Sequence, residues 1–184
     1  EINTMIGGVA GRQIELVERD DQADPALGKK IADELIGKEK VAATIGICNT
    51  GVGQLSIDSY QNAKVPLIIA VSTGTPLTKK FAAAPEHYIF RVSPREELQA
   101  PFIVAEALKR GLHKIALLAD TTGYGDAGKA DVEKALAAAK LAPVSVQRFA
   151  LGVKDLSEQV KEARAAGADA VISYTVGPEA AVLA

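Results

Sequence analysis

The sequence contains little cysteine and histidine, with one Cys and two His among its 184 residues. A single cysteine cannot form an internal disulfide, and together with two histidines it cannot build a Cys/His zinc site. Neither His87 nor His113 follows Cys48 at the spacing of a catalytic motif. We therefore predict a buried, inert thiol at Cys48. We also expect a protein that is not an enzyme, with no metal and no cofactor.

The sequence also lacks an excess of charge of one sign, and it lacks long hydrophobic runs. The 21 Lys and Arg residues nearly balance the 23 Asp and Glu residues, which argues against a nucleic-acid partner. The longest apolar run, Val65–Val71, has the length of a strand rather than the roughly 20 residues of a membrane span. The first residues do not resemble a secretory leader, so we expect either a cytosolic protein or one whose leader lies outside this chain.

What is present is an alternation of short apolar runs with segments whose apolar residues recur every three or four positions. Several of the runs are apolar without alternation, which is typical of strands buried on both faces of a parallel sheet. The pattern therefore predicts an α/β fold with doubly wound parallel sheets. The predicted strands are Gln13–Glu18, Val41–Ile47, Pro66–Val71, Tyr88–Val92, Lys114–Ala119, Val144–Phe149 and Asp169–Tyr174.

The regular βα spacing is broken once, near Tyr88–Val92, where a strand follows a polar loop without a full helix between them. We interpret this break as the crossover between two lobes, residues 1–93 and 94–184, although one continuous seven-stranded domain stays possible. A helix over Pro94–Arg110 is expected to open the second lobe, because Ser93, Pro94 and Glu96 form the pattern of an N-cap with a capping box.

The two ends of the sequence predict an incomplete fold. Residues 1–6 resemble the last turn of a helix that no strand precedes, and residues 177–184 begin a helix that stops after about a turn and a half. We therefore expect the first lobe to lack a strand and the second to be partial. An unpaired sheet edge would favour self-association of such a fragment.

A glycine motif at residues 123–128 matches the G-x-G-x-x-G pattern of dinucleotide-binding proteins and follows a predicted strand. The match is weak, because Asp120, Thr121 and Thr122 separate it from the strand, and Asp126 would compete with a pyrophosphate at the helix N-terminus. A Rossmann-type oxidoreductase that uses NAD(P) is therefore a minor alternative.

Small polar residues follow the predicted strands at several points. In open α/β sheets ligands bind at the carboxyl ends of strands, where hydroxyl and backbone N–H groups can hold a carboxylate without adding bulk. As plain helix caps or turns the same residues would need no further explanation. The candidate ligand-binding residues are Asn49, Thr50, Ser72, Thr73, Gly74, Thr75, Tyr124, Tyr174 and Thr175, with Tyr124 expected in an open loop.

An ordered series of segments over nearly the whole chain resembles type I periplasmic solute-binding proteins of ABC importers, in the branched-chain amino-acid-binding family. The series comprises residues 11–17, 20–25, 38–46, 65–75, 90–94 and 120–125. The resemblance implies two lobes that close by a hinge on a small amino acid or organic acid. The loop Asn49–Thr50 and the loop Ser72–Thr75 would hold the carboxylate of the ligand, and Tyr124 would cover the ligand from the second lobe.

The same resemblance implies a periplasmic or lipid-anchored location and a membrane permease as partner. Two features depart from the family: Cys48 has no partner for the disulfide of some relatives, and no aromatic stands near Val176. The acid that pairs with a ligand ammonium would lie beyond Ala184. A sensory or regulatory ligand-binding domain with the same fold, such as an amide or amino-acid sensor, is the main alternative.

Overall fold

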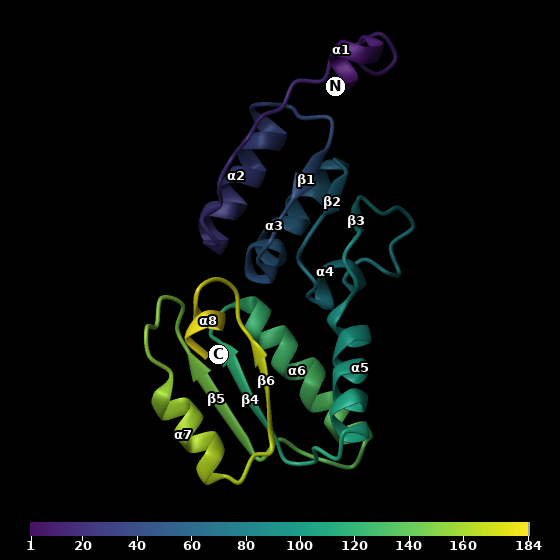
Figure 1. Ribbon diagram of the computed structural model, residues 1–184. Coiled ribbons are helices and arrows are strands. Elements are labelled where there is room, and N and C mark those ends of the chain that lie inside the picture. Colours follow the sequence, from purple (N-terminus) through teal and green to yellow (C-terminus); the bar gives the residue numbers. More distant parts are fainter. Residues whose placement is uncertain (184) are drawn as a thin grey trace.

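A computed structural model of the chain describes residues 1–183 and shows two α/β lobes, one above the other (Figure 1). Each lobe contains a parallel sheet of three strands, in the order β1-β2-β3 in the first and β5-β4-β6 in the second. Helices alternate with the strands along the chain. The predicted α/β fold with parallel sheets is therefore confirmed.

The first lobe holds short strands and longer helices. Helix α1 ends at Gly7, whose φ of 73° is the left-handed conformation that suits glycine after a helix. Asp24 caps α2 by accepting hydrogen bonds from the backbone N–H groups of Ala26 and Leu27. The elements are α1 (Ile2–Ile6), α2 (Pro25–Gly37), β1 (Thr44–Gly46), α3 (Thr50–Ala63), β2 (Leu67–Ile69), α4 (Pro76–Lys79) and β3 (Ile89–Arg91).

The second lobe is built around β4, all six residues of which are buried. Its Leu117 packs with α5 and α6 on one face, and its Leu118 packs with Phe149 and Leu156 on the other. The elements are α5 (Glu96–Lys109), β4 (Ile115–Asp120), α6 (Gly123–Ala138), β5 (Ser145–Phe149), α7 (Ser157–Ala165), β6 (Ala170–Tyr174) and α8 (Glu179–Leu183). Ala184, the last residue of the expected second lobe, lies outside the described residues.

The prediction of a strand at Gln13–Glu18 is wrong. This stretch has no ladder partner among the described residues, and Ile14 instead exchanges two hydrogen bonds with the side chain of Asn3. The stretch lines one side of a groove of about 1160 Å³, and β1 lines the other. A strand needs a neighbour to satisfy its backbone, so a β-type sequence alone does not make one here.

The prediction that α5 begins at Pro94 with a capping box is also wrong. The helix begins at Glu96, and Ser93 donates its hydroxyl to the backbone oxygen of Ser72 at 2.8 Å instead of capping. The carboxylate of Glu96 turns towards the other lobe. Along residues 1–183 no helix is both long and apolar enough to cross a bilayer.

Candidate functional site

The loops that follow β1 and β2 lie against each other at the lower end of the first lobe (Figure 1). The hydroxyls of Thr50 and Ser72 are 2.9 Å apart and share a hydrogen bond, and both side chains are buried. A Cβ at Gly74 would collide with the side chain of Thr50, so only glycine allows this approach. The structure thus brings three of the predicted site residues together in one small hydroxyl-lined rim.

Asn49 caps the 14-residue helix α3 at this rim. Its Oδ1 accepts a hydrogen bond from the backbone N–H of Gly51 at 2.8 Å, as the capping interpretation of this loop expects. Its Nδ2 is buried and has no hydrogen-bond partner among the described residues. An unpaired buried donor beside the positive end of a helix dipole favours a negatively charged or carbonyl group as its missing partner.

The second lobe meets this rim at the start of α6. The nitrogen of Gly123 lies 3.3 Å from the position that a Cβ on Gly51 would take, so the N-termini of α3 and α6 touch. Side chains on Gly125 and Gly128 would collide with the backbone of Asp120 and with the ring of Tyr174. The protein itself therefore fills the space around the G-x-G-x-x-G glycines, which accounts for the motif without a nucleotide.

Tyr124 does not stand in an open loop, as the sequence suggested, but in the first turn of α6, where it is half-buried. Thr122 caps this helix by accepting a hydrogen bond from the Tyr124 N–H. The ring of Tyr124 packs on that of Tyr174, with centroids 5.4 Å apart and planes tilted by 57°. The two aromatics named from the sequence thus form one pair at the carboxyl end of the second sheet.

The tyrosine pair lies in a negatively charged setting. Burial, followed by the charges of Glu96 and Asp120, raises the pKa of Tyr124 to about 12. Burial, a hydrogen bond to Glu96 and the charges of Glu96 and Asp131 raise the pKa of Tyr174 further. Both phenols therefore stay protonated at neutral pH and can donate hydrogen bonds.

Glu96 is the site residue that the sequence analysis missed. Its side chain is 2% exposed, and its carboxylate accepts hydrogen bonds from Thr73 Oγ1 at 2.5 Å and from Tyr174 OH at 2.8 Å. Sequence reasoning assigned it to a helix cap, because Ser-Pro-x-Glu fits that pattern equally well. Only the contact between residues 78 apart in sequence reveals its place at the lobe junction.

Thr75 makes a second contact across the junction. Its hydroxyl donates to Asp131 Oδ2 on α6 at 2.6 Å and accepts from the backbone N–H of Glu97 at 2.9 Å. The loop after β2 is therefore tied to the second lobe at both of its threonines. Thr175, by contrast, has a buried hydroxyl that no hydrogen bond joins to another described residue.

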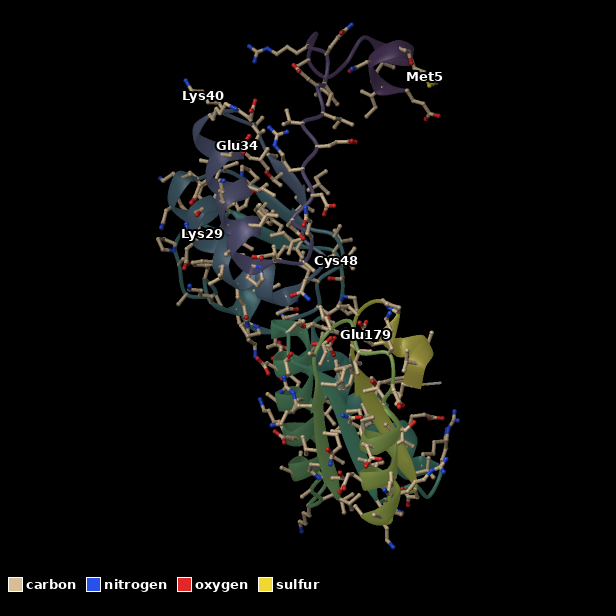
Figure 2. All side chains as sticks on the ribbon, turned by 90° about the vertical axis from the view of Figure 1, so that its left-hand side faces the viewer. Met5, Lys29, Glu34, Lys40, Cys48 and Glu179 are labelled. Atoms are coloured by element: carbon tan, nitrogen blue, oxygen red, sulfur yellow. The ribbon has the colours of Figure 1, made fainter. Side chains whose placement is uncertain are left out.

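The prediction that Cys48 is buried is wrong, because its side chain is exposed. Figure 2 shows Cys48 at the lower end of the first lobe and Glu179 at the upper end of the second. Ile47, just before the cysteine, has a φ of 64°, and this local turn directs the chain from β1 into α3. Within residues 1–183, no three His, Cys, Asp or Glu side chains are grouped so that they could hold a metal ion.

Comparison with known families decides the classification. A family model described as "Periplasmic binding protein" matches residues 1–184. The chain belongs to the periplasmic binding protein family. A member from Brucella abortus, the Leu/Ile/Val-binding protein homolog 2, is 31% identical over 180 residues, which are 96% of this chain and 47% of that protein. The chain thus spans about half the length of the curated relatives it matches.

Solved structures of family members agree with the fold. A solute-binding protein of an ABC transporter from R. palustris, in complex with 4-hydroxybenzoate, is 27% identical with a TM-score of 0.77, covering 89% of this chain and 44% of that one. A leucine-binding protein from Thermotoga maritima has a TM-score of 0.84 at 22% identity, covering 99% of this chain and 51% of that one. The predicted resemblance to type I periplasmic binding proteins is therefore confirmed.

Proposed function

We propose that this chain forms part of a non-catalytic solute receptor of an ABC importer, which binds a small carboxylate-bearing ligand between its two lobes by hinge closure. The observation that carries this proposal is that the loop after β2 joins the hydroxyl rim of the first lobe to the second lobe, where the tyrosine pair lies. Thr50 and Ser72 share a hydrogen bond at the rim, and Thr73 and Thr75 bond Glu96 and Asp131 of the second lobe. Such rims hold ligands in open α/β folds.

The ligand carboxylate is expected at the N-terminus of α3. Asn49 Nδ2 offers a buried donor without a partner there, and the hydroxyls of Thr50 and Ser72 lie beside it. Their mutual hydrogen bond uses only one of the two hydroxyl protons, and a carboxylate can replace it by accepting from both hydroxyls. The tyrosine pair would then cover the apolar part of the ligand.

The charges at the junction favour an amino acid over a simple organic acid. Glu96 and Asp120 are buried, and the hydrogen bonds found for their carboxylates come from neutral hydroxyl or N–H groups rather than from cations. The potential at this point is therefore negative, which attracts an ammonium group and repels a second anion. We rank branched-chain or other amino acids first, and aromatic or aliphatic acids second.

The remainder of the proposal rests on relatives. A protein from Pseudomonas aeruginosa that is 26% identical is named for binding leucine, isoleucine, valine, threonine and alanine. Other similar structures are solute-binding proteins of ABC transporters. We accordingly propose a periplasmic or lipid-anchored location. We also propose that the partner is a membrane permease, which recognises the closed state of the receptor.

Thermal unfolding in the presence of single amino acids, benzoate, 4-hydroxybenzoate, ATP and NADH tests the proposal. At about 100 times its dissociation constant a ligand adds about 2.7 kcal/mol of stability. For a chain of this size we therefore expect the true ligand to raise Tm by about 5 to 10 °C.

A Thr50→Val variant should weaken the binding of that ligand by about tenfold, because one hydroxyl donor is lost. Ser59→Ala on the outer side of α3, where Ser59 bonds Asp33, is the matched control and should bind as the unmodified protein does. Stabilisation by nucleotides alone would contradict the proposed function.

A further inference from the structure

Glu96 is a buried carboxylate without a salt bridge. No Lys, Arg or His side chain among residues 1–183 forms a salt bridge with it. Its partners are the hydroxyls of Thr73 and Tyr174, with the amide of Gln99 at 3.4 Å. Burying a carboxylate among neutral groups costs free energy that a helix cap on the surface would not. A role in starting helix α5 therefore does not explain why this carboxylate is buried.

The two hydroxyls that bond Glu96 come from different lobes. Thr73 follows β2 of the first sheet, and Tyr174 ends β6 of the second. The link to Thr73 is double, because the backbone N–H of Glu96 also donates to the Thr73 carbonyl at 2.9 Å. Because α5, which carries Glu96, belongs to the second lobe, these contacts with Thr73 are the ones that must break when the lobes separate. The bond from Tyr174 fixes the carboxylate within the second lobe.

We propose that Glu96 is a positioning residue that holds the two lobes closed against each other, by accepting one hydroxyl hydrogen bond from each. It acts through Thr73 and Tyr174 and needs no contact with a ligand. Because Tyr174 also packs on Tyr124, the same bond fixes the tyrosine pair opposite the hydroxyl rim of the first lobe. The contact between Thr75 and Asp131 supports the same arrangement at a second point.

The inference predicts a closed population in the protein without any ligand. It can be measured by pulsed electron–electron spin resonance between spin labels on Lys30→Cys in α2 and Lys161→Cys in α7, in a Cys48→Ser background. Both lysines are exposed and lie on helices of different lobes. The unmodified protein should show a distinct short-distance population that represents the closed state.

Thr73→Val removes only the hydroxyl that bonds Glu96 across the junction, and it should lower the closed fraction at least about twofold. Glu96→Ala should do the same. Glu96→Gln should restore the closed fraction, because the amide oxygen can still accept and the hydroxyls can reorient. Glu106→Ala, on the same helix but paired only with Arg110 at the surface, is the matched control.

Unchanged closed fractions in both Thr73→Val and Glu96→Ala would overturn the inference, and so would a Gln variant with a closed fraction as small as that of the Ala variant. If Glu96→Ala fails to fold by circular dichroism, Thr73→Val still decides. Since no ligand is present, a negative result here leaves the proposed binding function standing, and an absence of ligand binding leaves this result standing.

Discussion

The two lobes contain the same kind of sheet but bury it to different degrees. In the second lobe β4 has a neighbour on each side and is buried over its whole length. In the first lobe each strand has three residues, β1 lies at the edge, and Ile45 at its centre is 72% exposed. The second lobe therefore has the deeper core, whereas the rim loop after β2 in the first is held in part by hydrogen bonds to the second.

The largest expected effect tests this difference in burial. Leu117→Ala in β4 removes a side chain that packs against α5 and α6, and it should lower the free energy of unfolding by about 2 to 5 kcal/mol. Ile45→Ala in β1 should change it by no more than about 0.5 kcal/mol, because the side chain is already in solvent. Urea denaturation of both variants measures the two values.

Equal losses from these two variants would contradict the contrast between the lobes. They would show that Ile45 is covered in solution, for example by another copy of the chain. Sedimentation at two protein concentrations separates that case, because association with another copy would make the sedimentation coefficient rise with concentration.

A smaller effect is expected at Gly128, where the second lobe is most tightly packed. A Cβ at this position would collide with the ring of Tyr174, so Gly128→Ala should destabilise the protein by about 1 to 3 kcal/mol. Gly37→Ala, at the end of α2, meets open space and should leave stability unchanged or raise it by up to about 1 kcal/mol. Thermal unfolding of the two variants gives the comparison.

The Gly128 variant also reports on the glycine motif. If Gly128→Ala were as stable as the unmodified protein, the glycine would not be explained by the ring of Tyr174, and the dinucleotide interpretation of the motif would regain weight. Near-ultraviolet circular dichroism should show a changed tyrosine signal in Gly128→Ala and none in Gly37→Ala, because only the first variant displaces a ring.

The sequence was enough to predict what depends on local pattern. Apolar runs located the strands that have partners, and Asn49, which could be interpreted as a helix cap, does cap α3. The strand at Gln13–Glu18 failed, because pairing depends on a neighbour that no local pattern reveals. At the candidate site, too, local pattern predicted some residues and missed those that depend on distant contacts.

The rim hydroxyls of Thr50 and Ser72 could be predicted because they follow strands, but Glu96 could not. Its role depends on a contact with Tyr174, 78 residues away, and nothing in its local sequence distinguishes it from a capping acid. The exposed Cys48 was missed for a related reason. Burial is decided by the path of the loop around Ile47, not by the preference of the residue type.

The smallest expected effect concerns the ionisation of Tyr124 at the charged lobe junction. In the folded state burial, with the charges of Glu96 and Asp120, raises the pKa of Tyr124 from 10.0 to about 12. A raised pKa means that the folded protein holds this proton more tightly than the unfolded chain does. The stabilising contribution of Tyr124 is therefore full below pH 10 and is lost as the pH rises through about 12.

Tyr124→Phe should consequently show a shallower loss of stability between pH 10 and 12 than the unmodified protein, measured by urea denaturation at several pH values. Glu96→Gln should lower the pKa of Tyr124, seen in the tyrosinate absorbance, because a neighbouring negative charge is removed. Glu106→Gln, which removes a charge from the far end of α5, should leave that titration where it is. A Glu96→Gln titration identical to that of Glu106→Gln would mean that burial alone sets the ionisation of Tyr124, and the argument that the junction attracts an ammonium group would lose its support.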